Sequence, residues 1–417
     1  MKVAFIIQRY GAEILGGAEY HCRLIAERLA EHHEVEVLTT CARDYVTWKN
    51  EYPEGPDRVR GVTVRRFANA QTRDIDAFNR MSEWIFHHPH SRADELEWLR
   101  QQGPWCPKLI EYLERHQASY DALIFFTYLY APTVLGLQVA PARSILVPTA
   151  HDEPPIHLDI YKEMFGRPAA IAYNTEVERR FLASHFSIRA VAEDTVGCGV
   201  DLPPAGHGRP RQPDEPFADE GNAEEPLRVR PSIGGRGATF RRRHRMHGPI
   251  ALYGGRIEKG KGCEELIEYF GTYHEEGGEA ELALMGVKLM PLPELPYIRF
   301  AGLLSDRERQ EALEAATVVV VPSPHESLSL LALEAFSVGT PILANARCEV
   351  LVDHCLKSNA GLFYADRDEF VECLRVLVAD RGLRAAMGRN GRTYVRDNYR
   401  WDLVMGKIEK LVNRVRK

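Results

Sequence analysis

Short apolar runs alternate with amphipathic stretches along most of this 417-residue chain. The first run, residues 3–8, ends in a glycine-bearing loop, and residues 17–31 then repeat apolar side chains at helical spacing. Residues 35–39 form the next apolar run. The chain therefore begins with a strand–helix–strand unit, which is typical of a doubly wound parallel sheet. Further strands are predicted at 62–67, 122–126, 144–147, 170–173 and 191–197.

The same alternation resumes at residue 250. Strands are predicted at 250–253, 282–285, 297–300, 318–321 and 341–343, and helices at 263–274, 306–315, 330–338 and 367–378. Residues 401–415 have the apolar spacing of a final amphipathic helix. The pattern thus predicts two α/β domains, residues 1–202 and 249–395, followed by a helical segment, 396–417.

Residues 74–103 interrupt the first domain with a helical pattern that is rich in aromatic side chains. One interpretation is an inserted helical hairpin that packs a small core of its own. The other is a lip on the acceptor side of an active site, in which Trp84, Phe86 and Trp98 bind the acceptor.

Residues 203–248 separate the two domains and are rich in Pro, Gly, Arg and acidic residues. Their few aliphatic side chains cannot bury enough apolar area to offset chain entropy, so a poorly ordered linker is predicted. The basic run at residues 241–245 fits either a solvated linker or attraction to an anionic membrane surface.

Composition narrows the class of protein. Apolar residues make up 45% and charged residues 27% of the chain, as in globular proteins, and the net charge of -6 argues against nucleic acid as the main partner. No apolar run reaches the roughly 18 residues that suggest a membrane span. The eight cysteines form no C-x-x-C pair, which favours free thiols in a reducing cytoplasm. We expect a cytoplasmic protein, with peripheral contact at the inner membrane face if the basic run binds there.

Four segments carry candidate chemistry, and the first is a glycine-rich turn after the strand at 250–253. Gly254 and Gly255 let the backbone approach a ligand, and Arg256 and Lys261 follow before the next helix. Two fixed cations at the carboxyl end of a strand suit a diphosphate. Glycine–lysine turns are also common without any ligand.

The second segment contains Glu326 and Glu334, eight positions apart after a β-branched strand. We expect Glu326 in a loop and Glu334 in the opening turns of a helix. Free N–H groups at 329–331 would then point at an anion. Glu326 would bind sugar hydroxyls and Glu334 a ribose; the alternative is a solvated acid and a helix-capping acid.

The third and fourth segments lie in the first domain. Gly16 and Gly17 open the first helix, where a phosphate can approach the backbone, although a flexible turn explains them equally well. His151 directly follows the strand at 144–147, the position where active-site groups of open α/β sheets gather, although a lone histidine is often structural.

Together these segments resemble glycosyltransferase family 4. The resemblance covers the chain outside 74–103 and 203–248. It rests on Gly255-Arg256 with Lys261-Gly262, on Glu326 and Glu334 with Gly339-Thr340-Pro341, on Gly16-Gly17-Ala18-Glu19, on Gly199-Val200-Asp201 and on Trp401. It implies the GT-B fold, two Rossmann-like domains facing each other across a cleft, with a C-terminal helix crossing back to the first domain.

The resemblance also implies a role for each residue. Arg256 and Lys261 would clamp the diphosphate. Glu326 would bind the donor sugar, Glu334 would bind the ribose, and His151 would lie near the sugar. His151, Arg256, Lys261 and Glu326 are the expected catalytic residues. The remaining donor contacts are expected from Gly16, Gly17, Gly255, Ser327, Leu328, Ser329 and Leu330. The family usually has the sequence Glu-Gly-Phe-Gly-Leu where this chain has serines at 327 and 329, so the resemblance does not identify the donor sugar.

The expected function is therefore a retaining, metal-independent hexosyltransferase without a cofactor. It would move sugar from a nucleotide-diphosphate sugar to a hydroxyl of a glycan, lipid-linked glycan or other acceptor, in polysaccharide or glycoconjugate synthesis. A GT-B sugar-nucleotide epimerase and a non-catalytic nucleotide-sugar-binding protein are the alternatives.

Overall fold

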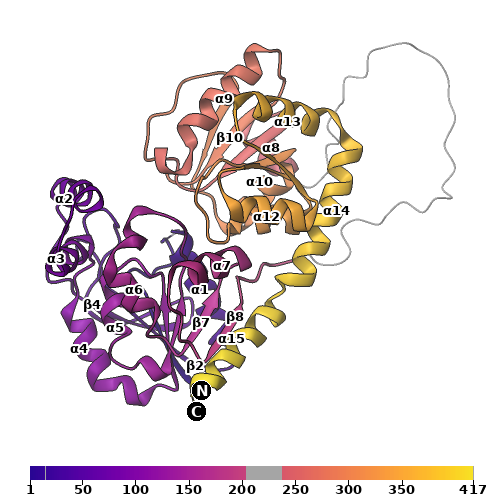
Figure 1. Ribbon diagram of the computed structural model, residues 1–417. Coiled ribbons are helices and arrows are strands. Elements are labelled where there is room, and N and C mark those ends of the chain that lie inside the picture. The colour runs from indigo at the N-terminus through magenta and orange to yellow at the C-terminus, as the bar shows by residue number, and fades with distance from the viewer. Residues whose placement is uncertain (15, 203–236, 417) are drawn as a thin grey trace, which may run out of the picture. The chain divides into compact units, whose positions relative to one another are not determined.

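The computed structural model describes residues 1–14, 16–202 and 237–416, and most of the linker predicted at 203–248 lies outside them. The described chain divides into two compact units (Figure 1). The first contains residues 1–199, 325–330 and 399–417, and the second contains residues 200–324 and 331–398. The predicted pair of parallel α/β sheets is confirmed.

The first unit is built on an eight-stranded sheet in the order β3-β4-β2-β1-β5-β6-β7-β8. All neighbours are parallel except β3 and β4. The strands are β1 (Lys2–Ile6), β2 (Glu34–Thr40), β3 (Gly55–Val59), β4 (Val62–Phe67), β5 (Ala122–Phe126), β6 (Ser144–Val147), β7 (Ala170–Tyr173) and β8 (Ala192–Thr195). The strand order reverses between β1 and β5, so the loops after these strands begin a ligand-binding edge.

Apolar clusters cover both faces of this sheet, because its buried strands present apolar side chains on each side. The helices are α1 (Gly17–Leu29), α2 (Ile75–His87), α3 (Arg92–Gln102), α4 (Pro107–His116), α5 (Ala131–Gly136), α6 (Asp159–Phe165), α7 (Glu176–His185) and α15 (Trp401–Val415). Short 3-10 turns lie at η1 (Gln117–Ser119), η2 (Pro141–Arg143) and η3 (Pro154–His157).

The predicted amphipathic helix α15 returns to the first unit and covers β6, β7 and β8 (Figure 1). Its apolar face joins the core that also contains α1. Gly199 leaves room for this helix, because a Cβ there would lie 2.3 Å from the Trp401 ring. The C-terminal helix therefore completes a domain that begins almost 400 residues earlier in the chain.

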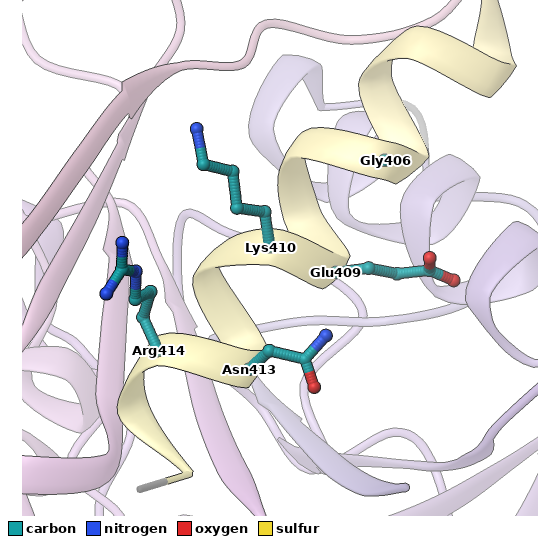
Figure 2. A pocket seen from close by; sticks show the side chains of 5 residues that line it. All are labelled: Gly406, Glu409, Lys410, Asn413 and Arg414. Carbon is teal, nitrogen blue, oxygen red and sulfur yellow. The ribbon is translucent and has the colours of Figure 1, made fainter.

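The outer face of α15 carries a shallow surface pocket (Figure 2). Its lining residues all come from this one helix and are Gly406, Glu409, Lys410, Asn413 and Arg414. Their side chains spread apart, and no second element supplies a wall. The pocket lies on the solvated side of an amphipathic helix and gives no candidate active site.

The aromatic segment 74–103 forms the predicted helical hairpin, α2 and α3. Trp98 is buried between Phe78 and Phe86, with ring centroids 5.7 and 5.8 Å away, and its indole donates to the Ser82 hydroxyl. Trp84, by contrast, is 40% exposed. Trp98 and the partly buried Phe86 pack into the apolar core of the first unit, not into a separate small core, and Trp84 is the accessible member of the three.

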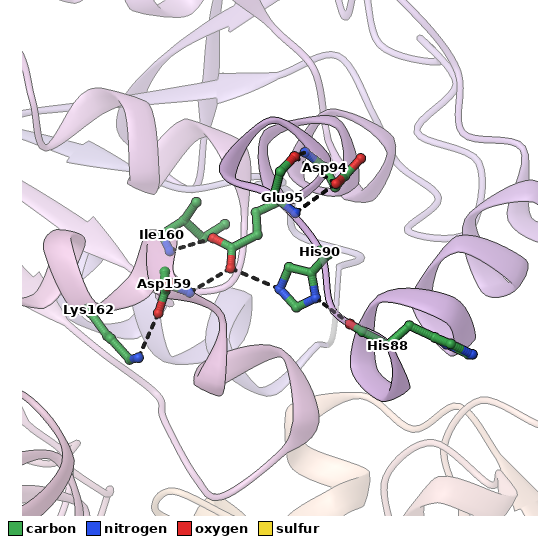
Figure 3. A network of polar contacts seen from close by, with 8 residues as sticks. His88, His90, Asp94, Glu95, Asp159, Ile160 and Lys162 are labelled. Carbon is green, nitrogen blue, oxygen red and sulfur yellow. Dashed lines mark hydrogen bonds and ion pairs between the residues drawn. The ribbon is translucent and has the colours of Figure 1, made fainter.

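A buried carboxylate ties this hairpin to the rest of the unit (Figure 3). Glu95 of α3 accepts hydrogen bonds from the backbone N–H groups of Asp159 and Ile160, at 2.9 and 2.8 Å, and lies 3.2 Å from the His90 ring. The helix α6 has no side-chain cap of its own, so Glu95 satisfies its first N–H groups from another element. The hairpin is thus anchored in the domain.

The second unit contains a six-stranded parallel sheet in the order β11-β10-β9-β12-β13-β14. The strands are β9 (Ile250–Gly254), β10 (Glu281–Met285), β11 (Ile298–Gly302), β12 (Val318–Val321), β13 (Ile342–Asn345) and β14 (Gly361–Tyr364). The helices are α8 (Ala238–His244), η4 (Lys259–Lys261), α9 (Cys263–Glu275), α10 (Asp306–Ala315), α11 (Leu330–Val338), α12 (Glu349–Ser358), α13 (Arg367–Ala379) and α14 (Arg381–Asn398). This is the 3-2-1-4-5-6 order of dinucleotide-binding sheets, whose switch point here lies between β9 and β12.

The described end of the predicted linker is not loose: residues 238–244 form the helix α8 against α10. Phe240 is buried, Arg241 donates to the carbonyls of Gly248 and Ala315, and Arg243 pairs with Glu308. The linker prediction was wrong for residues 238–244, because the low average hydrophobicity of residues 203–248 hid the one aromatic side chain that is buried here. Two cations of the basic run are engaged within the unit, which reduces the charge available to a membrane.

Within the described ranges, no helix combines the length and the hydropathy that a membrane crossing requires.

Candidate active site

The switch point of the second sheet brings together two of the segments singled out in the sequence. β9 ends at Gly254 and the turn after it begins with Gly255, and the segment after β12 begins with Pro322 and Ser323. Because β9 and β12 pair as parallel neighbours, their carboxyl ends lie at the same edge of the sheet. Ligands of open α/β sheets bind at such an edge.

Close backbone packing explains the glycines at this edge. Gly255 adopts a φ of 145°, and a Cβ on Gly286 would lie 2.0 Å from the Gly255 carbonyl oxygen. Gly262, at a φ of 73°, approaches β12 so closely that a Cβ would lie 2.4 Å from the Pro322 oxygen. The glycines hold the turn against its neighbours, in addition to any contact with a ligand.

The two predicted clamp cations lie on this turn. The Arg256 guanidinium is about one-third exposed and lies 3.0 Å from a Glu258 carboxylate oxygen. The Lys261 ammonium lies 3.5 Å from the Ser323 hydroxyl, which links the β9 turn to the end of β12. Both cations therefore stand at the switch-point edge. Glu258 and Ser323 are neighbours that sequence reasoning did not single out.

The glutamate-bearing segment has the local structure predicted for it. Glu326 is half-buried in the loop, and α11 begins at Leu330, so Glu334 lies in the second turn of that helix. Ser327 lies in the loop as well, and Leu328 is buried. The N-terminus of this nine-residue helix presents backbone N–H groups that have no partner within the helix.

Ser329 precedes α11 with a φ of 62°, a left-handed conformation that disfavours residues with a Cβ. This serine stands at the second glycine of the family pattern named above. The chain therefore keeps the glycine-type backbone at this position with a serine side chain.

Glu334 has a partner that the sequence did not indicate. Its carboxylate lies 2.5 Å from an Arg309 guanidinium nitrogen of α10, and burial raises its pKa even though Arg309 opposes that shift. Nothing in the periodicity of α10 distinguishes Arg309 from an ordinary surface arginine. The ion pair orients the Glu334 carboxylate and restricts which ligand groups can approach it.

In the first unit, His151 lies in the loop after β6 among polar partners. Its Nε2 lies 3.6 Å from Glu153, whose carboxylate also accepts a 2.6 Å hydrogen bond from the Tyr128 hydroxyl. Burial alone would raise the Glu153 pKa, but the interactions with His151 and Tyr128 hold it below its ordinary value. The His151 ring stacks on His325, with centroids 5.3 Å apart. An ionised carboxylate therefore lies beside His151.

The glycine turn at α1 has its own ion pair. Arg9, just after β1, is buried and lies 2.6 Å from the Glu19 carboxylate in the first turn of the helix. A Cβ on Gly16 would lie 2.1 Å from a Glu19 oxygen, whereas Gly17 faces open space. A side chain at position 16 would thus displace the Glu19 carboxylate, and Gly17 is the glycine with room for a ligand.

Across the described part of the chain, His, Cys, Asp and Glu side chains form no group of three that could hold a metal ion. The candidate chemistry consists of two groups of residues, one in each unit. The switch-point group contains Arg256, Lys261, Ser323, Glu334 and Arg309. The group in the first unit contains His151, Glu153, His325, Glu326, Ser327 and the glycines of the α1 turn.

Two α/β units, each with a glycine turn at its switch point, define the GT-B class of proteins, and comparisons with known proteins agree. Residues 238–394 match the family described as glycosyl transferases group 1. The sulfoquinovosyl transferase SQD2 of Arabidopsis thaliana is 31% identical over 173 residues, which are 38% of this chain and 32% of that protein. The match therefore spans about a third of this relative's length.

Solved structures support the fold over the whole chain. Sucrose-phosphate synthase from Thermosynechococcus elongatus superposes with a TM-score of 0.68 at 17% identity, covering 99% of this chain and 98% of that one. Anabaena HepE, solved with UDP and glucose, has a TM-score of 0.67 at 15% identity and covers 99% of both chains. The second unit therefore matches the glycosyl transferases group 1 family, and the chain has the GT-B fold.

Proposed function

We propose that this protein is a retaining glycosyltransferase that transfers a sugar from a nucleoside diphosphate sugar to an acceptor hydroxyl. The acceptor attacks the anomeric carbon on the face from which the diphosphate leaves. The glycosidic bond to the phosphate breaks, the new bond to the acceptor oxygen forms, and the leaving diphosphate takes the acceptor proton. The protein holds both substrates in place and stabilises the charge that grows on the phosphate.

The observation that carries this proposal is the pair of cations on the β9 turn. Arg256 and Lys261 stand at the switch point of a six-stranded sheet with the dinucleotide-binding order. The N–H groups at the start of α11 add partial positive charge. These groups supply charge that a metal ion would otherwise provide. We therefore expect turnover to survive EDTA.

The donor is proposed to be a UDP-sugar, since the related fold of HepE was solved with UDP and glucose. Glu334 would bind the ribose and Glu326 the sugar hydroxyls. Gly17 and the segment Ser327, Leu328, Ser329 and Leu330 would approach the donor through their backbone. The Glu153 carboxylate would keep the His151 ring oriented beside the sugar. The acceptor is proposed to be a glycan or lipid-linked glycan, with Trp84 its accessible aromatic contact.

Replacing Lys261 tests this proposal. Loss of one preorganised charge-stabilising donor costs about 10²–10³ in kcat, so Lys261→Ala should fall in that range while the protein stays folded. Lys259→Ala is the matched control, since Lys259 lies in the same 3-10 turn but is 83% exposed and pairs with Glu264. UDP release from UDP-sugars, with a panel of acceptors, is the assay. Near-normal turnover of folded Lys261→Ala would place the diphosphate elsewhere and overturn the proposal.

The same assay separates the alternatives. A sugar-nucleotide epimerase would convert a labelled UDP-sugar without any acceptor, and a non-catalytic binding protein would be stabilised by the donor but release no UDP. Either result would overturn the transferase proposal and leave the fold and the family match of residues 238–394 intact.

A further inference from the structure

A buried carboxyl group in the first unit has no role in the site described above. Glu178 lies in the first turn of α7 and is 1% exposed. Among the described residues, no Lys or Arg forms an ion pair with it. Burying an unpaired acid is costly, and a side chain of similar shape without the charge would avoid that cost. The cost of burying Glu178 therefore points to a function that only an acid at this position can provide.

The two oxygens of Glu178 hold two different loops. One accepts a 2.5 Å hydrogen bond from the backbone N–H of Ala150, in the loop after β6. The other accepts a 2.6 Å hydrogen bond from the backbone N–H of Asn174, just after β7. These strands are parallel neighbours, so Glu178 joins their carboxyl ends.

Each of these loops leads directly to the candidate site. Ala150 immediately precedes His151 and follows Thr149, which has a φ of 51°, so this turn is held in a left-handed conformation that surrounding contacts must stabilise. The Asn174 amide donates a 3.2 Å hydrogen bond to the Ser327 hydroxyl, in the segment expected to contact the donor. One carboxyl group thus fixes the turn that carries His151 and the loop that contacts Ser327.

We infer that Glu178 is a positioning residue for transfer, which sets the places of His151 and Ser327 through the backbone of Ala150 and Asn174. This rests on the proposed function, because it assigns Glu178 to the same site. Burial raises the Glu178 pKa to about 8 in spite of the two backbone donors. Both hydrogen bonds can form in either protonation state, since each Glu178 oxygen can accept from its backbone N–H whether or not the carboxyl group is ionised.

Glu178→Gln tests the inference with little change of shape, because the amide nitrogen cannot accept a hydrogen bond and one backbone N–H loses its partner. Displacement of reacting groups by about 1 Å costs up to roughly 10²-fold in rate. We expect kcat to fall about 10–100-fold while the Kd for UDP stays within about twofold, because the diphosphate clamp lies in the other unit.

Glu36→Gln is the matched control. Glu36 is also buried in the first unit, where it accepts from Arg65 and Tyr120 near the amino ends of β2 and β5. Glu36→Gln should lower stability and leave kcat unchanged. Equal kcat values for the two variants would overturn the positioning role. If Glu178→Gln does not fold, Glu178→Asp, which keeps both acceptors on a shorter side chain, replaces it with the same expectation.

Hydrogen exchange distinguishes failure of this inference from failure of the proposed function. Glu178→Gln should speed exchange in peptides that contain Ala150 and Asn174, and Glu36→Gln should not. That result in a protein without transferase activity would uphold the link between the loops and refute the function. Unchanged exchange at both loops would overturn the inference whatever the activity.

Discussion

Replacing Ser329 with glycine should stabilise this protein without harming donor binding. A residue with a Cβ pays about 1–2 kcal/mol for the left-handed conformation that Ser329 adopts at a φ of 62°. Glycine removes that cost but adds unfolded-state entropy worth roughly 0.4–1 kcal/mol. The difference is a gain of about 0.5–1 kcal/mol, which raises Tm by roughly 1–4 °C for a unit of this size.

Thermal unfolding with and without UDP is the assay, and Ser329→Val is the contrasting variant. Valine is β-branched and adopts positive φ only as an outlier, so Ser329→Val should lower Tm and weaken UDP binding by distorting the start of α11. A lower Tm for Ser329→Gly, or a Ser329→Val protein that matches wild type, would refute the argument from backbone strain.

Three further predictions follow from placements described above. Glu334→Ala should weaken the binding of free UDP about 10–100-fold, because hydrogen bonds to a charged group are lost. Glu326→Ala should weaken the binding of the UDP-sugar only. Equal losses of affinity for both ligands in calorimetric titrations would refute this assignment. Trp98→Ala should cost about 3–5 kcal/mol in denaturant unfolding, whereas Trp84→Ala should raise the acceptor KM and leave stability nearly unchanged. Since the Glu178 pKa is raised from 4.5 to about 8, wild-type stability should fall as pH rises through that range, and the Glu178→Gln curve should lack this fall.

The buried strands could be predicted closely from sequence because parallel strands covered on both faces read as continuous apolar runs. β5, β6 and β7 have the predicted bounds. β3 was not predicted, because its sequence Gly-Pro-Asp-Arg-Val has no such run. It forms by pairing with β4 across a two-residue turn, Arg60-Gly61, in which both φ angles are positive, as the preferred hairpin turns require.

The candidate site was predictable where it depends on strand ends and glycine turns, and not where it depends on contacts between distant elements. Arg309 meets Glu334 across two helices, and no local pattern indicates that contact. Glu178 shows the limit more sharply. Thr175 and Glu178 have the spacing of a capping box, in which the acid would bond back to the cap residue. Instead its oxygens reach Asn174 and, across the sheet edge, Ala150.

Because α15 returns to the first unit, the first unit cannot complete its fold before the second unit has been synthesised. Domains usually fold as they emerge, beginning with the N-terminal one. Here the apolar surface of the first sheet is covered by side chains as late as Val404, Ile408 and Val415. All residues of the second unit are synthesised before these side chains are. We therefore expect nascent chains to bury the second unit's core first, while the first unit depends on chaperones or on partial burial until α15 leaves the ribosome.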